Sequence, residues 1–345
     1  MPFRNEAEFV HWLGRRWPRH GHGFALGIGD DAAIVRPRPG RELVLTSDLS
    51  IEGIHFRADL HPPRSVGHRA LARALSDLAA MGATPRFALL SLALARHTTR
   101  SWVAAFYDGL GRLGQRFAVT LIGGDTAVVE GAITVDIMAV GEVERGHALL
   151  RSGARAGDRI YVTGRLGLSA LGLDLARNGA RVPPSPPPFV RPRGAPGAEE
   201  NREALAAHFY PQPRCAAGIA LVRRRLASAA IDVSDGFAAD LVRLCESSGC
   251  GAVIRQAQLP LPPPTAGRDS LELGLHGGED YELIFTVPAA RAGRMPRSLG
   301  GVALRQVGQI QAARGLTLAS ADGREVPLDA RGYDHFRDFR TPGRR

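Results

Sequence analysis

The chain alternates between short apolar runs and longer stretches in which apolar side chains recur every three or four residues. An apolar run of strand length predicts a strand, and the three-to-four spacing predicts a helix with one buried face. The predicted strands lie at 42–47, 87–95, 118–122, 133–143, 160–163, 229–231 and 281–287. The predicted helices lie at 3–17, 65–81, 101–115, 164–177, 201–207, 216–227 and 237–247.

Acidic residues recur beside glycine or hydroxyl residues, mostly where an apolar run meets a turn. Neighbouring carboxylates repel each other, and a divalent cation held by oxygen ligands relieves that repulsion. The pattern therefore predicts one polynuclear metal site gathered from several strand ends. The motifs are Gly27-Ile28-Gly29-Asp30-Asp31, Thr46-Ser47-Asp48, Ser76-Asp77, Gly123-Gly124-Asp125-Thr126, Asp232-Val233-Ser234-Asp235-Gly236 and Gly277-Gly278-Glu279-Asp280.

Some of these acids also have a structural interpretation. Asp77 lies one turn before a predicted helix end and can pair with Arg73 four residues earlier. Asp235 can cap the helix predicted at 237–247. Asp125 can close an Asx-type turn between strand and loop.

Two further acids carry the same ambiguity. Glu279 can face solvent from its turn instead of binding a ligand. Asp136 lies inside a predicted strand with no partner nearby in the sequence, so we expect a solvated strand residue there.

Length and composition indicate a two-domain globular protein. The 345 residues exceed one average domain, and the character of the sequence changes near residue 150. We expect an N-terminal domain at 1–150 and a C-terminal domain at 151–336, with a proline-rich surface insertion at 182–197 and a basic tail at 337–345. No apolar run is long enough to span a membrane, and 3–17 is unlike a signal peptide. Three cysteines without a CxxC pair fit a reducing compartment, so we expect a cytoplasmic protein.

The charge pattern excludes some chemistry. The net charge is +10, yet all 44 basic residues are arginines and they are scattered, with no interleaved aromatic residues at the densest group. We therefore expect neither nucleic-acid nor membrane binding. The absence of lysine excludes a P-loop and a Schiff base. Phosphate groups must then be bound by metal ions, arginine and backbone amides, which points to Mg²⁺-assisted phosphoryl transfer.

The motif set, read in order with Arg151-Ser152-Gly153 and Tyr281-Glu282-Leu283, resembles the thiamine-monophosphate kinase family. That family belongs to the superfamily of aminoimidazole ribonucleotide synthetase and selenophosphate synthetase. The resemblance runs from about residue 24 to residue 336. It implies an α/β N-terminal domain, an α+β C-terminal domain and a homodimer joined through the N-terminal sheets.

The resemblance also implies roles for individual residues, carried over position by position. Thiamine monophosphate is expected at His55, Glu279 and Tyr333, and ATP at Gly124, Asp125, Arg151 and Ser234. The implied magnesium ligands are Asp31, Thr46, Ser47, Asp48, Asp77, Asp125, Asp232 and Asp235. Among them Asp31, Asp77, Asp125 and Asp232 are expected to serve catalysis through the metal.

The reaction implied is in-line transfer of the γ-phosphoryl group of ATP to thiamine monophosphate, giving thiamine diphosphate and ADP. The acceptor phosphate is already largely anionic near neutral pH, so no general base is needed. Two alternatives remain. A superfamily relative, such as a selenophosphate or aminoimidazole ribonucleotide synthetase, could activate another acceptor, and the absence of a reactive cysteine near the N-terminus weakens the first of these. A regulator could bind ATP without turnover, although every acidic motif is retained.

Overall fold

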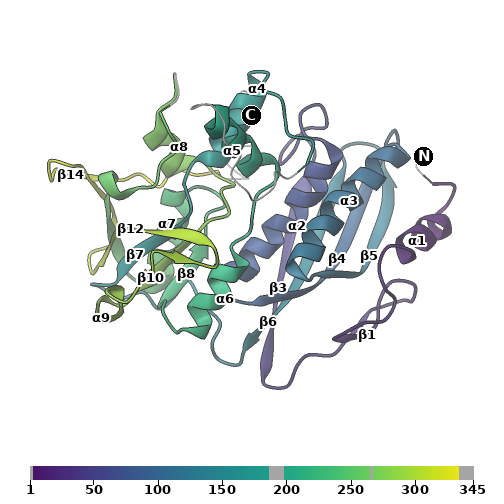
Figure 1. Ribbon diagram of the computed structural model, residues 1–345, viewed down its shortest axis with the longest axis horizontal. Helices are drawn as coiled ribbons and strands as arrows, with labels where there is room; N and C mark the ends of the chain where they lie inside the picture. Colours follow the sequence, from purple (N-terminus) through teal and green to yellow (C-terminus); the bar gives the residue numbers. More distant parts are fainter. Residues whose placement is uncertain (1–2, 186–197, 265–266, 334–345) are drawn as a thin grey trace. The chain divides into compact units, whose positions relative to one another are not determined.

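A computed structural model describes residues 3–185, 198–264 and 267–333 (Figure 1). Most of the proline-rich stretch at 182–197 and all of the tail at 337–345 lie outside the described residues. The chain divides into two compact units, one from 1–78 and 83–147 and the other from 79–82 and 148–345. Each unit is described by itself.

The first unit is a four-stranded sheet in the order β3-β6-β4-β5, with β4 and β5 parallel and the other neighbours antiparallel. Figure 1 shows α2 and α3 lying across one face of this sheet. A separate ribbon of β1 and β2 belongs to the same unit. The elements are α1 (Glu6–Gly14), β1 (Phe24–Leu26), β2 (Ile34–Val35), β3 (Arg41–Ile51), α2 (Pro63–Ala80), β4 (Thr84–Ala95), α3 (Arg100–Phe117), β5 (Thr120–Val129) and β6 (Thr134–Glu144).

Small residues bring α2 and α3 together. A Cβ atom on Gly67 would lie 2.0 Å from the carbonyl oxygen of Phe106, and one on Gly109 would lie 1.9 Å from that of Arg64. No side chain fits at either position, because real Cβ contacts are never so short. The two helices therefore pack backbone to backbone and cover the sheet as one layer.

The second unit is built on a sheet in the order β14-β13-β9-β12-β7-β10-β8, with β11 paired to β12. A core cluster joins the strands to α7 through side chains such as Ile160, Val162, Ile231, Phe237 and Leu241. The strands are β7 (Arg159–Thr163), β8 (Ala229–Asp232), β9 (Gly251–Arg255), β10 (Leu283–Val287), β11 (Ser298–Leu299), β12 (Val302–Gln311), β13 (Gly315–Ala319) and β14 (Glu325–Pro327). The helices are α4 (Leu168–Arg177), α5 (Ala198–Phe209), α6 (Cys215–Arg223), α7 (Phe237–Ser248), η1 (Gln256–Gln258), α8 (Ser270–His276) and α9 (Ala289–Ala292).

Two strands run further than the sequence predicts. The strand predicted at 42–47 continues to Ile51, and the one predicted at 118–122 continues to Val129. The prediction of a turn at Gly123-Gly124-Asp125-Thr126 is therefore wrong, and Asp48 and Asp125 lie inside strands instead of at their ends. The cause is unbroken pairing, because β6 pairs with every residue of β3 and β5 stays in register with β4 from Gly123 onward.

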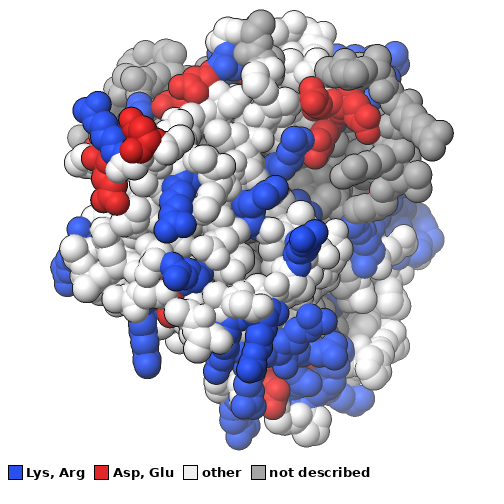
Figure 2. Space-filling view, turned by 60° about the vertical axis from the view of Figure 1, so that its left-hand side comes forward, with Lys and Arg blue, Asp and Glu red and all other residues white. Residues whose placement is uncertain are grey.

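Arginine side chains are spread over the face shown in Figure 2, with a denser group at its lower edge and acidic residues between them elsewhere. Within the described part of the chain, no helix is both long and apolar enough to cross a membrane.

Candidate functional site

One group of polar residues lies between the sheet of the first unit and α2. Side chains alternate along a strand, so Thr46 and Asp48 of β3 share one face. The Thr46 hydroxyl donates a 2.5 Å hydrogen bond to Oδ2 of Asp77 on α2. Arg73, one turn earlier on the helix, places Nη2 3.7 Å from Oδ1 of Asp48. Strand and helix thus bring two predicted metal ligands, Asp48 and Asp77, to one place.

The environment of Asp48 disfavours a bare negative charge. Burial, and next the nearby carboxylate of Asp77, raise the pKa of Asp48 to about 6, while Arg73 opposes the rise. Oδ2 of Asp48 is buried and has no hydrogen-bond partner. A desolvated oxygen beside a second carboxylate is a suitable donor for a hard divalent cation.

A second polar group lies on the opposite face of the same sheet. The Ser47 hydroxyl donates a 2.7 Å hydrogen bond to Oδ1 of Asp136 on β6. Ser91 of β4 pairs in register with Asp136 on one side and with Asp125 of β5 on the other. Directly opposed residues point to the same face of a sheet, so these side chains form one polar row across it. Asp136 lies within a strand, as expected, and its partner comes from a strand 89 positions away in the sequence.

The loop with the paired aspartates belongs to this second face. Phe24 of β1 packs with Phe87, Ile122 and Val140, which fixes the β1–β2 ribbon on the sheet. The ribbon's loop carries Asp31, whose amide donates to Oδ1 of Asp30 at 3.0 Å. The predicted ligands of the first unit are therefore split. Thr46, Asp48 and Asp77 lie on the helix side, and Ser47 and Asp125 lie on the other side with the ribbon.

His55 follows β3 in the chain. Its Nδ1 accepts the backbone N–H of Ile51 at 3.0 Å. The imidazole lines a small pocket together with Arg69 and Arg73. Because Arg73 also lies against Asp48, the His55 pocket adjoins the carboxylate group on the helix side.

In the second unit, β8 leads into a loop at 233–236 that carries predicted ligands of both metal and nucleotide. Asp232 is buried at the end of β8, opposite Leu283 of β10. The exposed Arg151 lies beside this strand, since the N–H of Ala230 donates to the carbonyl of the preceding residue, Leu150, at 3.0 Å. Gly236 forms the N-cap of α7 without a side-chain hydrogen bond, so Asp235 does not cap that helix.

A residue missed by the sequence analysis, Asp240, organises this loop. Its Oδ2 accepts the backbone N–H groups of Ser234, Asp235 and Gly236 at 2.9, 3.0 and 3.2 Å. Burial and then the charge of Asp235 raise the pKa of Asp240 to about 6, against the effect of Arg243. Arg243 Nη1 lies 2.5 Å from Asp235 and 2.6 Å from Asp240. The sequence did contain a signal for Asp240: it is an acid in the first turn of a predicted helix, where the backbone amides have no intrahelical partner.

The two predicted acceptor-binding residues of the second unit converge on the same loop. The N–H of Glu279 donates to the carbonyl of Ser234 at 2.8 Å, and the N–H of Tyr333 donates to that of Asp235 at 3.3 Å. Gly278 allows the first approach, because a Cβ there would lie 2.7 Å from the Ser234 oxygen. The Tyr333 side chain is exposed. Residues predicted to bind nucleotide, metal and acceptor thus meet around 232–236.

A closed metal centre is absent from the described part of the chain, where no group of three or more His, Cys, Asp or Glu side chains has the geometry to hold an ion. The carboxylates instead stand in pairs or rows. Such an arrangement suits ions that take part of their coordination from phosphate oxygens.

Comparison with known proteins identifies the relatives of this chain. Residues 29–143 match the N-terminal domain of AIR synthase related proteins, and residues 155–320 match their C-terminal domain. The thiamine-monophosphate kinase of Escherichia coli O157:H7 is 40% identical over 318 residues, covering 90% of this chain and 92% of the relative.

Solved structures agree with the sequence comparison. A thiamine-monophosphate kinase from Stenotrophomonas maltophilia K279a superposes with a TM-score of 0.76 at 33% identity, covering 92% of this chain and 95% of the other. AaThiL complexed with AMPPCP and TMP superposes with a TM-score of 0.72 at 28% identity, covering 97% of this chain and 99% of the other. With both domains matched and relatives aligned over almost their whole length, this chain belongs to the thiamine-monophosphate kinase family of AIR synthase related proteins.

Proposed function

We propose that this chain transfers the γ-phosphoryl group of ATP to thiamine monophosphate, giving thiamine diphosphate and ADP. The similarity to thiamine-monophosphate kinases over nearly the whole chain carries the proposal. A relative of 28% identity, AaThiL, has been solved with AMPPCP, an analogue of ATP, and with TMP, which we read as thiamine monophosphate. The chemistry agrees, since the sequence offers carboxylates and arginines for phosphate handling and no lysine.

The donor set fits Mg²⁺. The buried, unpartnered Oδ2 of Asp48 beside Asp77 is a hard oxygen donor in a place where a cation would relieve repulsion. We propose Asp31, Thr46, Ser47, Asp48, Asp77, Asp125, Asp232 and Asp235 as the residues that hold it. The side chains of Thr46 and Ser47 point to opposite faces of β3, so they would serve different ions, or one would contribute its main-chain carbonyl. When bound, Mg²⁺ neutralises the charge that develops on the transferred phosphoryl group.

We assign nucleotide binding to Gly124, Asp125, Arg151 and Ser234, and acceptor binding to His55, Glu279 and Tyr333. The exposed ring of Tyr333 can lie against the flat, cationic thiazolium. The carboxylate of Glu279 can attract its charge or bind the amino group of the pyrimidine. The acceptor oxygen is anionic near neutral pH, so the roles left to the protein are orientation and charge neutralisation.

We further propose that the chain forms an N-terminal α/β domain that binds metal and ATP at 1–150 and a C-terminal α+β domain at 151–336. The chain would work as a homodimer in the cytoplasm. Support for the dimer comes from exposed apolar residues on the sheet face that carries the polar row, namely Leu43, Leu45, Leu49 and Met138. Several exposed apolar side chains on one face are typical of an association site. The free state of all three cysteines, Cys215, Cys245 and Cys250, suits a reducing compartment.

The test is an assay of the purified chain with ATP, Mg²⁺ and thiamine monophosphate, with thiamine as a parallel acceptor. Thiamine diphosphate should form one-for-one with ADP, from the monophosphate only. Asp125→Asn should reduce turnover by about a hundredfold or more, as loss of a group that neutralises transition-state charge does. Because Asp125 is exposed, the variant should unfold at the same temperature as the wild type.

Asp59→Asn is the matched control in the same unit. Asp59 is exposed and pairs with Arg57, and such surface pairs contribute about 0–1 kcal/mol. Its turnover should stay within about twofold of the wild type. ATP binding without any diphosphate product would overturn the proposal and favour another acceptor or a regulatory role.

A further inference from the structure

The turn that carries Glu279 has an unusual backbone. Glu279 and Tyr281 both adopt left-handed conformations, with φ of 64° and 51°, although neither is glycine. A residue with a side chain is strained in this conformation and persists there only where the surroundings hold it. The direction of the Glu279 side chain is therefore set by its neighbours.

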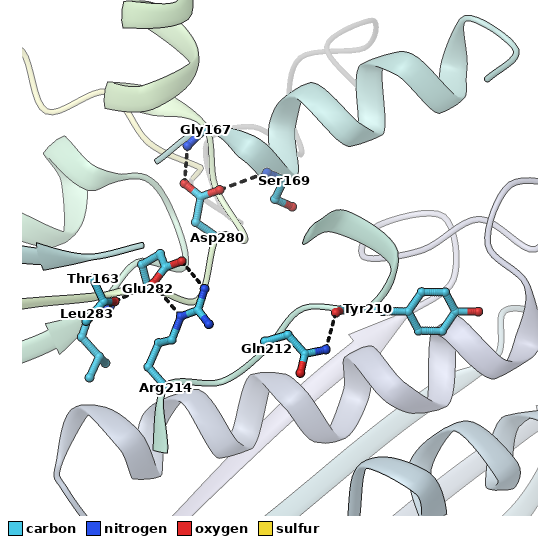
Figure 3. Close-up of polar contacts among 9 residues, drawn as sticks. All are labelled: Thr163, Gly167, Ser169, Tyr210, Gln212, Arg214, Asp280, Glu282 and Leu283. Atoms are coloured by element: carbon cyan, nitrogen blue, oxygen red, sulfur yellow. Dashed lines mark hydrogen bonds and ion pairs between the residues drawn. The ribbon is translucent and has the colours of Figure 1, made fainter. Parts of the chain in front are cut away.

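Main-chain contacts fix this turn on two sides. The N–H of Glu279 donates to Ser234, and that of Tyr281 donates to the carbonyl of Val233 at 2.9 Å. Between them, the carboxylate of Asp280 accepts the N–H of Gly167 at 2.6 Å and that of Ser169 at 3.0 Å (Figure 3). These two amides belong to the start of α4. The turn is thus clamped between the 233–236 loop and a helix N-terminus.

His208, near the end of α5, completes the surroundings of Glu279. Its side chain is almost fully buried, and its Nδ1 lies 3.0 Å from the Ser169 hydroxyl and 3.8 Å from Oε2 of Glu279. The imidazole is held in place because α5 packs closely on α4. A Cβ on Gly172 of α4 would lie 2.0 Å from the carbonyl oxygen of Ala204. The ring of Phe209 adds an edge-to-face contact, with centroids 4.9 Å apart.

We propose that His208 is a positioning residue that holds the Glu279 carboxylate toward the acceptor and so sets the affinity for thiamine monophosphate. This inference rests on the proposed function. In the tautomer with its proton on Nδ1, the imidazole would donate to Ser169 Oγ and attract Oε2 of Glu279, which would limit the rotamers open to that carboxylate. His208 acts through Glu279, and its effect falls on acceptor binding because ATP is assigned to other residues.

Two variants of His208 distinguish the contribution of Nδ1 from that of Nε2. In His208→Asn the amide N–H group occupies about the place of Nδ1, and in His208→Gln it occupies about the place of Nε2. His208→Gln should raise the KM for thiamine monophosphate about tenfold, the usual effect of losing an orienting partner, with kcat and the KM for ATP within about twofold. His208→Asn should stay within about threefold of the wild type. Ser169→Ala should raise the same KM by a smaller factor.

A double-variant cycle with Glu279→Gln decides whether His208 acts through that residue. If it does, His208→Gln adds nothing to the KM rise already caused by Glu279→Gln. Additive effects, or equal losses for ATP and the acceptor, would overturn the role of His208. Melting temperature and AMPPCP binding identify a variant that merely misfolds, and Ser169→Ala then still tests the inference.

Failure of the proposed function would give a different result from failure of the role assigned to His208. In that case the wild type itself forms no thiamine diphosphate and binds no thiamine monophosphate by calorimetry, and the role assigned to His208 falls with it. A wild type that turns over normally, with a His208→Gln variant of unchanged KM for the acceptor, overturns the positioning role alone.

Discussion

The hydroxyl of Thr46 donates a 2.5 Å hydrogen bond to Oδ2 of Asp77, so a strand and a helix 31 positions apart in the sequence meet at one carboxylate. The bond orients Asp77 beside Asp48, whose pKa is raised to about 6 by burial and by that neighbour. Thr46 thereby helps to hold together two negative groups that would otherwise separate.

Thr46→Val should weaken Mg²⁺ activation. The substitution keeps the shape of the side chain but removes the hydroxyl, which orients Asp77 and is itself a proposed donor to the metal, so metal affinity should fall by at least about tenfold. The Mg²⁺ concentration for half-maximal activity should rise by that factor, while Thr46→Ser should stay near the wild type. Equal Mg²⁺ dependence in the two variants would show that the hydroxyl does not orient Asp77.

The second unit contains a buried ion pair whose loss should destabilise the fold. Arg214 Nε lies 2.6 Å from Oε2 of Glu282, and the Thr163 hydroxyl donates to the same oxygen (Figure 3). Arg214→Met leaves the Glu282 carboxylate buried without its cation, and breaking such a pair costs about 3–5 kcal/mol. Urea unfolding should show a loss of that size.

Replacing both residues of the ion pair tests whether the unpaired charge causes the loss of stability. Arg214→Met with Glu282→Leu removes the stranded charge, so it should recover much of the stability lost by Arg214→Met alone. A double variant less stable than either single variant would mean that packing, not charge, explains the loss.

Stability should also respond to pH through Asp280. Burial raises the pKa of Asp280 to about 8, against the opposing effect of the two amides it accepts. In the unfolded chain an aspartate titrates near 4, so between about pH 4 and pH 8 the folded protein holds a proton that the unfolded chain has lost. Asp280 therefore reduces stability as pH rises through this window.

Asp280→Asn removes that titration. The free energy of unfolding of the variant, relative to the wild type, should improve steadily from pH 4 to pH 8 and level off above pH 8. A difference that is independent of pH would show that Asp280 is ionised in the folded state across the window.

The acidic motifs were visible in the sequence because glycine and hydroxyl neighbours mark them locally. The positions of these acids within their strands were harder to predict from the sequence. Asp48 and Asp125 interrupt apolar runs and therefore look like strand ends, yet both lie inside strands because pairing with β6 and β4 continues past them. Asp125 points to the polar face of the sheet, where an acid in mid-strand costs little, and Asp48 points to the helix side, where Arg73 lies 3.7 Å away. Local spacing reveals neither environment.

Long-range partners also escaped the sequence analysis. Arg214 and Glu282 are 68 positions apart in the sequence. Asp136 and its partner Ser47, on β3, are 89 positions apart. Periodicity reports which face a residue occupies on its own element, but the partner on another element depends on the tertiary fold. The carboxylates are divided between the two faces of the sheet, with two on the helix side and others on the opposite face. This division follows from the alternation of side chains along β3 once the true length of that strand is known.

The proposed dimer gives the last prediction. Leu45 is 60% exposed on the sheet face of the first unit, so a charge there costs a monomer little but opposes burial in an interface. Leu45→Arg should therefore shift the mass measured by sedimentation from dimer toward monomer without lowering the melting temperature of the monomer. Val326→Arg, at a residue 37% exposed on β14 of the second unit, is the matched control and should leave the mass unchanged. A wild type that sediments as a monomer at every concentration, or a Leu45→Arg variant that remains a dimer, would mean that this face does not join two copies of the chain.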